Sequence, residues 1–347
     1  MEERKHPTPE RGATSTLRRM QLDSTEARRL RQGCPRLCLP TVARPDTEGF
    51  VFEARSWFQD AAPKRLREAL LRWSVEADAP GLLLVDGWGS EPDLPPTPTD
   101  PGRTHQKASN FSETLLVGVA GLIGEPIGFE AEGGRLVTDL TAVRGQVDAL
   151  TNEGAVGLDW HNEHAATGLR LEPYAQPISD LLFFSLRDDP RGRAKTLVAD
   201  VRDAQRLLDE EDIAILHEPR FHLRLPYLLR AASSEAPPRS APRPILTGPA
   251  HAPQISCALY GDLTSATDSR AALALAALKQ ALSRVRYELD APPGRLVLLD
   301  NRKTVHARAP YVPRFDGTDR WIQRTLVTRD LPGLRPWQQS GPRVLRC

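Results

Sequence analysis

Apolar residues recur along the chain with two different spacings, one typical of helices and one typical of buried strands. After Pro63, the residues Leu66, Leu70, Trp73 and Ala77 recur at helical spacing, with charged residues between them that would face water. Further helices are predicted at about 107–123, 198–216 and 269–285. Short apolar runs between Gly, Pro and Asp predict strands at 81–88, 180–186, 221–229, 295–300 and 320–328. This pattern predicts an α+β fold, in which helices pack on a mainly antiparallel sheet or barrel.

The distribution of proline and of apolar residues suggests how the chain is divided. Residues 1–45 are rich in Arg, Thr and Pro and have no apolar period, so we expect a loosely structured N-terminal segment. Residues 46–347 then form a single domain. Two Pro-rich stretches, 91–103 and 233–249, are expected to be insertion loops, because proline removes backbone donors. Either loop could be an active-site lid or a plain surface loop.

Composition narrows the possible partners and the compartment. The chain has 46 basic and 45 acidic residues among 347, so nothing indicates a nucleic acid or a membrane as partner. The N-terminus lacks the apolar segment of a secretory signal, and no run reaches the ~20 apolar residues of a transmembrane helix. The four cysteines are interpreted as reduced thiols, since no second Cys/His pair completes a zinc site with Cys34 and Cys38. We therefore expect a cytoplasmic protein.

The motif DWHNEHA (159–165) contains the first candidate metal ligands. In an extended segment, residues two apart point to the same face, so His161 and Glu163 could bind one ion. A second strand could bring in His306, and two imidazoles with one carboxylate suit iron(II) with open coordination positions. A His-x-Glu sequence also occurs often by chance. In that case the histidine is an ordinary surface or core residue and the Glu next to it is solvated. His164 is a less favoured ligand, because it would point to the opposite face of a strand.

Two arginines follow in DGTDRWIQRTLV (316–327). If this stretch is a strand, Arg320 and Arg324 share one face, and two buried guanidiniums would need anionic partners. The fork of arginine binds carboxylates in a bidentate manner, so the pair matches two small acidic ligands. The alternative is a pair of surface arginines with Asp316 and Asp319 as counter-ions.

Together these motifs carry a family resemblance. The order LDWHNEHA, AKTLVADVRDA (194–204) and LLDNRKTVHARAPYVPRFDGTDRWIQR (298–324) resembles the clavaminate synthase-like branch of the TauD/TfdA oxygenases, over about residues 80–330. That branch includes hydroxylases of arginine, asparagine and lysine. The resemblance implies a double-stranded β-helix (jelly roll) with flanking helices. It also implies Fe(II) as the cofactor, with 2-oxoglutarate and O2 as co-substrates.

The resemblance also implies roles for single residues. His161, Glu163 and His306 match the iron ligands, and a carboxylate ligand distinguishes the chain from halogenases of this fold. Arg320 and Thr196 match the residues that bind 2-oxoglutarate. The matches to substrate-binding positions are Arg324, Thr151, Asn152 and Asp262. Where the family often has Thr between the His and Glu ligands, this chain has Asn162.

The function that this resemblance implies is hydroxylation of an unactivated C–H bond of an L-amino acid, free or bound to a carrier protein, in specialised metabolism. Two alternatives stay open. A zinc hydrolase could use the same His/Glu/His set, although it leaves both arginines unexplained. A non-catalytic jelly-roll protein could instead bind a small acid.

Overall fold

The computed structural model describes residues 17–34, 45–91, 93–100, 107–165, 177–226 and 239–346. The helices are α1 Ser24–Gln32, α2 Glu48–Ala61, α3 Lys64–Val75, α4 Phe111–Ile123, α5 Val201–Gln205, α6 Glu210–Leu216 and α8 Ser269–Arg284, with 3-10 turns η1 Glu130–Glu132 and η3 Pro332–Trp337. The strands are β1 Leu17–Gln21, β2 Leu82–Asp86, β3 Glu125–Phe129, β4 Thr138–Leu140, β5 Leu158–His161, β6 Asp180–Arg187, β7 Thr196–Asp200, β8 Phe221–Leu223, β9 Leu246–Thr247, β10 Gln254–Ile255, β11 Thr264–Ala266, β12 Tyr287–Leu289, β13 Leu296–Asp300, β14 Thr304–Arg308, β15 Trp321–Thr328 and β16 Val344–Leu345.

The larger sheet has the strand order β1-β2-β13-β6-β15-β3-β16, with β4 also paired to β15. Its central strand β6 is buried on both faces, as the two sets of alternating side chains show. Leu182 and Phe184 belong to a core cluster with residues of α2, α3 and α4. Leu181 and Phe183 belong to a second cluster, which also includes Val198 of the smaller sheet. The larger sheet therefore lies between a helical layer and the smaller sheet.

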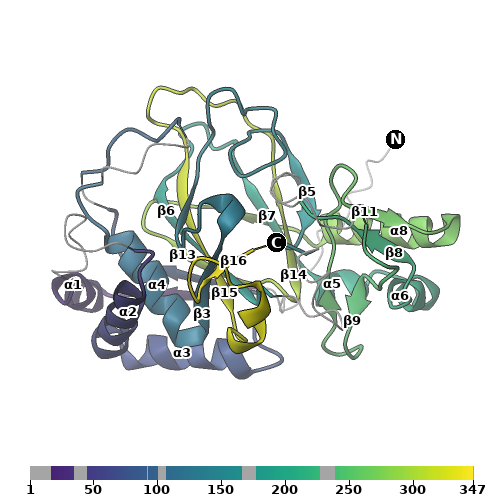
Figure 1. Cartoon of the computed structure of the whole chain (residues 1–347), viewed down its shortest axis with the longest axis horizontal. Coiled ribbons are helices and arrows are strands. Elements are labelled where there is room, and N and C mark those ends of the chain that lie inside the picture. The colour runs from purple at the N-terminus through teal and green to yellow at the C-terminus, as the bar shows by residue number, and fades with distance from the viewer. Residues whose placement is uncertain are drawn as a thin grey trace, which may run out of the picture.

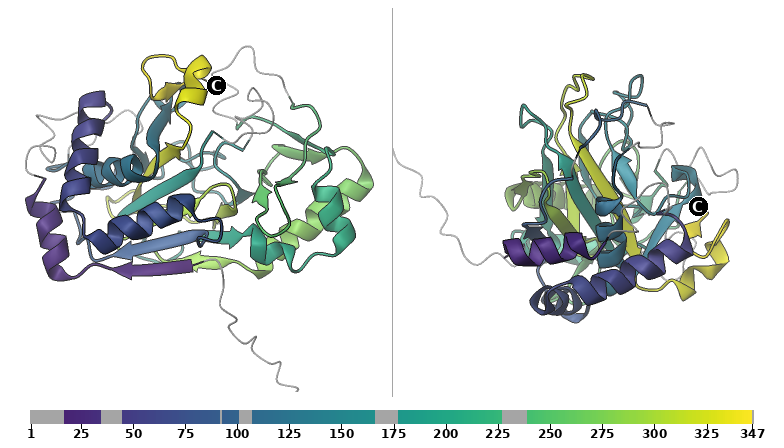
Figure 2. Two further views of the ribbon diagram at one scale, coloured as in Figure 1. Left: turned by 90° about the horizontal axis from the view of Figure 1, so that it is seen from below. Right: turned by 90° about the vertical axis from the view of Figure 1, so that its left-hand side faces the viewer.

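The smaller sheet has the order β12-β7-β14-β5 and is antiparallel throughout. Its outer side packs on α5, α6 and α8 through a third apolar cluster that includes Val305 of β14 and Leu278 of α8. Figures 1 and 2 show the two groups of helices, α1–α4 and α5–α8, at opposite ends of the molecule. The strands between them carry the candidate site.

Most predicted elements are present, although β8 covers only 221–223 of the strand predicted at 221–229, of which 227–229 lie outside the described residues. Two further expectations differ from the structure. The helix predicted at 198–216 is wrong as a single element, because its first residues belong to β7, which pairs with β14. The rest divides into α5 and α6, whose N-termini are capped by the side chains of Asp200 and Asp209. The expectation of a loose segment over 1–45 also fails for residues 17–34. There β1 pairs in parallel with β2, and a capping box at Asp23 begins α1.

The two expected insertion loops are only partly described. Residue 92 and residues 101–103 of the first loop lie outside the described residues, and its described part contains no helix or strand. Residues 233–238 of the second loop also lie outside them, while β9 occupies part of the remainder and pairs with β10.

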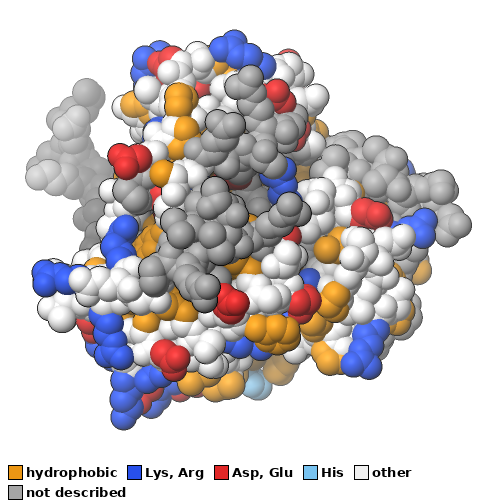
Figure 3. Space-filling view, turned by 60° about the vertical axis from the view of Figure 1, so that its left-hand side comes forward, with side chains coloured by type: hydrophobic (Ala, Val, Ile, Leu, Met, Phe, Trp, Pro, Cys, Tyr) orange, Lys and Arg blue, Asp and Glu red, His pale blue; other side chains and the backbone are white. Residues whose placement is uncertain are grey.

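The described surface shows no large region of a single charge or of apolar side chains on the face drawn in Figure 3. On the face in Figure 3, basic and acidic side chains are interspersed with small apolar patches. Among the described helices, none combines the length and the apolar content needed to cross a bilayer.

Candidate active site

Two histidines face each other across neighbouring strands of the smaller sheet. His161 ends β5 and His306 lies in β14, and the two residues are direct partners in the antiparallel pairing. Directly opposed residues place their side chains on the same face. The imidazole ring centroids are accordingly 4.2 Å apart. The structure thus brings together the two histidines that the sequence analysis paired.

Glu163 lies in a turn beyond β5. The strand ends at His161, and His164 has a left-handed backbone with a φ of 52°. The expectation of one extended segment through Glu163 is therefore wrong. The backbone N–H and C=O of Glu163 form hydrogen bonds with the side chain of Asn301, not with a neighbouring strand. The turn still directs the carboxylate towards the histidines, since Glu163 Oε2 is 3.9 Å from His306 Nε2. His161, Glu163 and His306 are called the three candidate ligands below.

The surroundings give these side chains the charge states of metal ligands. His161 Nδ1 is 2.7 Å from the carbonyl oxygen of Asp159, which fits an Nδ1–H donor and leaves Nε2 for a metal. Burial lowers the pKa of His161, and burial with nearby positive charge lowers that of His306 well below its usual range. Burial raises the pKa of Glu163, but Arg324, His164 and His161 together outweigh burial and the net pKa is lowered. Two neutral imidazoles and one carboxylate fit iron(II).

In this structure the carboxylate of Glu163 is held by Arg324. Glu163 Oε2 is 3.0 Å from Arg324 Nη1, and its Oε1 is 3.6 Å from His164 Nε2. Within the described residues, no three His, Cys, Asp or Glu side chains already meet at metal-ligand spacing. The candidate ligands therefore match iron(II) in side-chain type, while the carboxylate of Glu163 is turned towards Arg324.

A cavity of about 60 Å³ next to the candidate ligands has Arg320 and Thr196 in its wall. Arg320 is 7% exposed, and its Nη1 donates to the carbonyl oxygen of Ala194 at 3.1 Å and to Thr196 Oγ1 at 3.3 Å. Its Nε has no hydrogen-bond partner, and burial lowers the pKa of the guanidinium. Among the described residues, both partners of Arg320 are neutral. Asp188 and Asp189 act on this guanidinium through their charge but accept no hydrogen bond from it, so a ligand carboxylate would supply a direct counter-ion.

Arg308 adds a second guanidinium to the same cavity. Its Nε donates to the carbonyl oxygen of Val156 and its Nη1 to that of Thr151, both at 3.0 Å, while Nη2 has no partner. Burial, with the nearby charge of Arg320, lowers the pKa of Arg308 to about 10, so the side chain stays protonated at neutral pH. The sequence analysis gave Arg308 no role. The available signal was its position two residues after His306 on one strand, which places both side chains on the same face.

A buried ion pair lies on the other side of the candidate ligands. Arg324 Nη2 is 2.5 Å from Glu132 Oε2, and the Arg324 side chain is 1% exposed. Burial raises the pKa of Glu132, but Arg324 and His164 together outweigh burial and the net pKa is lowered. The pair borders a cavity of about 450 Å³ whose wall also contains Thr151 and Asn152. The carboxylate of Glu132 and the guanidinium of Arg324 lie side by side, so they match the ammonium and carboxylate groups of a free amino acid.

The sequence analysis missed Glu132. It ends the 3-10 turn η1, and nothing in the stretch FEAEGG (129–134) distinguishes it from Glu130. His164, which was expected to point away from the ligands, instead lies 3.7 Å from Glu132 Oε1 and stacks on Phe129. The left-handed backbone of His164 explains this difference, because it rotates the side chain out of the strand alternation.

Asp262 is placed differently from the other predicted substrate contacts. Its carboxylate pairs with Arg224. A third cavity, of about 50 Å³, borders the candidate ligands and is also lined by Glu132, Arg224 and Tyr260, and Asp262 is not among its described lining residues. The ring of Tyr260 meets His161 edge to face, with centroids 5.1 Å apart. The acidic contact expected for a basic substrate is therefore not presented to this cavity.

Comparison with known proteins gives one family. Residues 46–326 match the model of the family described as "Taurine catabolism dioxygenase TauD, TfdA family". The chain is 32% identical to L-asparagine oxygenase of Streptomyces coelicolor, over 93% of each chain. It is 30% identical to clavaminate synthase 2 of Streptomyces clavuligerus, over 85% of this chain and 88% of the relative.

Solved structures agree with these sequence matches. Asparagine oxygenase in complex with Fe(II), 2S,3S-3-hydroxyasparagine and succinate superposes with a TM-score of 0.84 at 31% identity, over 94% of this chain and 98% of the other. The non-heme iron oxygenase OrfP, in complex with Fe and alpha-ketoglutaric acid, superposes with a TM-score of 0.81 at 26% identity, over 95% and 100%.

Proposed function

Because the chain belongs to the TauD/TfdA dioxygenase family, we propose that it hydroxylates an unactivated C–H bond of a free L-amino acid at a site built from the residues above. The protein is an Fe(II)- and 2-oxoglutarate-dependent dioxygenase. One observation supports the placement of its site most directly. The three candidate ligands share a cavity with a buried arginine whose described partners are all neutral.

In this proposal, His161, Glu163 and His306 hold the iron. Bound iron(II), with 2-oxoglutarate and O2, supplies the oxidising power that breaks the substrate C–H bond. The protein supplies orientation and exclusion of water, for which the low exposure of the ligands is suited: His161 is buried and the side chains of His306 and Glu163 are 12% and 14% exposed. The two facing sheets would form the double-stranded β-helix expected from the sequence.

We place 2-oxoglutarate in the Arg320 cavity. Its distal carboxylate pairs with Arg320, and the Thr196 hydroxyl, already 3.3 Å from Nη1, assists. Arg308 adds positive charge to the cavity wall and holds the loop that contains Thr151. The second ligand class, the amino acid, then lies on the other side of the iron.

We place the amino-acid substrate against the Arg324–Glu132 pair. Its carboxylate binds Arg324 and its ammonium group binds Glu132, with Thr151 and Asn152 in the same wall. Arrival of a second carboxylate at Arg324 would release Glu163 to the metal. This arrangement favours a free amino acid over a carrier-bound one, because a thioester has no carboxylate to offer Arg324. Asp262 is a weaker candidate, since Arg224 already neutralises it.

The relatives give no support to the zinc hydrolase or to the binding protein, because the matched proteins are named as oxygenases and hydroxylases. The cytoplasm remains our proposed compartment, and the buried free thiol of Cys257 is consistent with it.

The test is succinate formation by the purified protein with iron(II), ascorbate, 2-oxoglutarate and a panel of L-amino acids. We expect one amino acid to raise succinate formation, its methyl ester to fail, and His161→Ala to abolish turnover. Activity on the ester alone would refute the carboxylate contact at Arg324 and point to a carrier-bound substrate. Absence of turnover in all conditions would refute the site.

A further inference from the structure

The side chain of Asn301 holds the peptide of Glu163 from both sides. Asn301 is 1% exposed and lies in the turn between β13 and β14. Its Oδ1 accepts the backbone N–H of Glu163 at 2.9 Å, and its Nδ2 donates to the carbonyl oxygens of Glu163 and Ile178, each at 3.1 Å. One amide thus satisfies both backbone groups of Glu163, as a neighbouring strand would do.

A second asparagine returns the contact. Asn162 lies between the candidate ligands His161 and Glu163 and is 2% exposed. Its Nδ2 donates to the carbonyl oxygens of Asn301 and Thr304 at 2.6 and 2.9 Å, and its Oδ1 accepts the N–H of Cys257 at 3.0 Å. The two side chains therefore bind each other's segments, and every polar atom of both amides is engaged. We call Asn162 and Asn301 the asparagine clamp.

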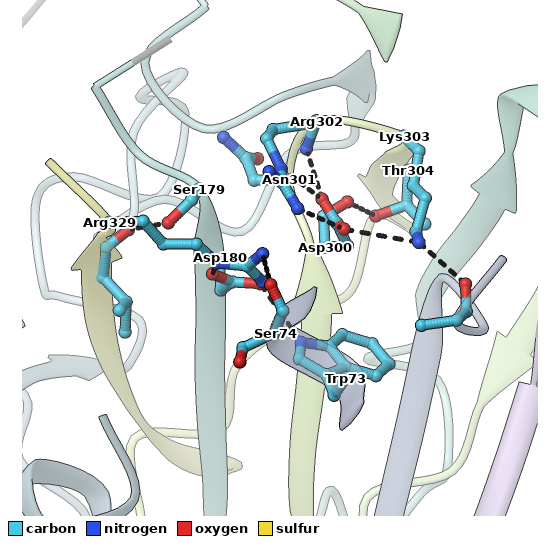
Figure 4. Close-up of polar contacts among 12 residues, drawn as sticks. Trp73, Ser74, Ser179, Asp180, Asp300, Asn301, Arg302, Lys303, Thr304 and Arg329 are labelled. Carbon is cyan, nitrogen blue, oxygen red and sulfur yellow. Dashed lines mark hydrogen bonds and ion pairs between the residues drawn. The ribbon is translucent and has the colours of Figure 1, made fainter. Parts of the chain in front are cut away.

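The turn that carries Asn301 is itself fixed from its other side, as Figure 4 shows. Asp300 binds Arg302 at 2.9 Å and lies 3.4 Å from Lys303 Nζ. Its cross-strand partner Asp180 binds Arg329 at 2.7 and 3.0 Å. These buried ion pairs make the turn a rigid support.

We propose that the asparagine clamp positions the carboxylate ligand of the iron site. Glu163 stands outside β5, so strand pairing cannot orient it, whereas the clamp fixes its peptide relative to His161 and His306. Its side chain can then turn from Arg324 to the metal without a backbone rearrangement, which keeps the entropic cost of metal binding low. This inference rests on the proposed function, because it assumes iron at the three candidate ligands.

The test is titration of the ligand-free full chain with Co(II), followed through the d–d absorption of the bound ion. We expect Asn301→Ala and Asn162→Ala to weaken Co(II) binding by roughly 10–100-fold, as loss of a partner that orients a ligand does elsewhere. The matched control is Thr304→Val. Its hydroxyl donates to the carbonyl oxygen of Asp300 in the same turn at 2.8 Å, whereas its backbone carbonyl, which accepts from Asn162 Nδ2, is retained by valine. The control should lower the thermal stability and leave the Co(II) affinity and spectrum unchanged.

The outcomes separate this inference from the proposed function. If His161→Ala abolishes Co(II) binding and Asn301→Ala leaves it unchanged, the clamp is refuted and the metal site stands. If Thr304→Val weakens binding as much as Asn301→Ala, the effect is general loosening and the clamp is again refuted. If the unmodified chain binds Co(II) no better than His161→Ala, the metal site and the clamp both fail. Should Asn301→Ala not fold, Asn162→Thr removes part of the contacts, and an unchanged affinity in that variant would refute the clamp.

Discussion

Replacing Arg320 by methionine should stabilise the ligand-free protein. Methionine retains an aliphatic stem and removes a buried guanidinium whose described partners are the neutral oxygens of Ala194 and Thr196. Burying such a charge costs several kcal/mol, which two hydrogen bonds from a charged donor offset by about 1.5–3 kcal/mol each. Removal also relieves the repulsion with Arg308. We expect the free energy of unfolding to rise by about 1–2 kcal/mol.

The same variant should lose its response to 2-oxoglutarate. Removing one partner of a buried ion pair costs about 3–5 kcal/mol, which corresponds to a Kd at least roughly 100-fold higher. At a 2-oxoglutarate concentration near 100 times the Kd of the unmodified protein, that protein gains about 2.7 kcal/mol of stability. The variant should gain about 0.4 kcal/mol or less at the same concentration.

Denaturant unfolding, with and without 2-oxoglutarate, measures both effects. Arg320→Lys is the matched control, because it keeps the charge and loses the bidentate fork, so it should respond to the ligand at an intermediate level. The reasoning is wrong if Arg320→Met lowers the stability of the ligand-free protein. It is equally wrong if 2-oxoglutarate stabilises this variant as much as the unmodified chain.

Three further predictions concern other groups. Glu132→Gln should raise the KM for the amino acid about 10–100-fold, because a charged hydrogen bond to the ammonium group is lost, and should leave the KM for 2-oxoglutarate unchanged. Initial rates measured with each of the two substrates varied separately test this prediction. Burial raises the pKa of Glu91 although Lys107 Nζ lies 3.7 Å from its Oε1, so above the unfolded-chain pKa of 4.5 the folded state binds this proton more tightly than the unfolded chain does. Glu91→Gln should therefore increase the melting temperature near pH 7 and have little effect near pH 4, and equal shifts at both would contradict the argument. Burial also raises the pKa of the Cys257 thiol, so iodoacetamide should label Cys257 only after denaturation, as mass spectrometry would show.

Strand periodicity made part of the site predictable. Residues two apart on a strand share a face, and this rule predicted that Arg320 and Arg324 both point inward. Both side chains are buried, Arg320 in the wall of one cavity and Arg324 in the wall of another. His306 was expected to come in on a second strand, and the structure has it in β14, opposite His161.

The remaining features depend on contacts far apart in the sequence. The turn at Glu163 is held by Asn301, 138 residues away, and no local signal distinguishes such a turn from an extended segment. Glu132 gains its role only when packing places η1 against Arg324. The start of the helix predicted at 198–216 was lost to pairing with β14, which local helical periodicity cannot reveal.

The spacing between Arg320, which directly precedes β15, and Arg324, which lies in β15, affects which carbon of the substrate is oxidised. Arg320 and Arg324 are four residues apart, which is about 13 Å along an extended chain. Under the proposed assignments, this strand sets the separation between the distal end of the co-substrate and the carboxylate of the substrate, with the metal between them. The oxidised carbon is then the one at a fixed distance from the substrate carboxylate, whatever the length of the substrate side chain. Loops around the cavity could change to accept a different amino acid while the oxidised position stayed the same.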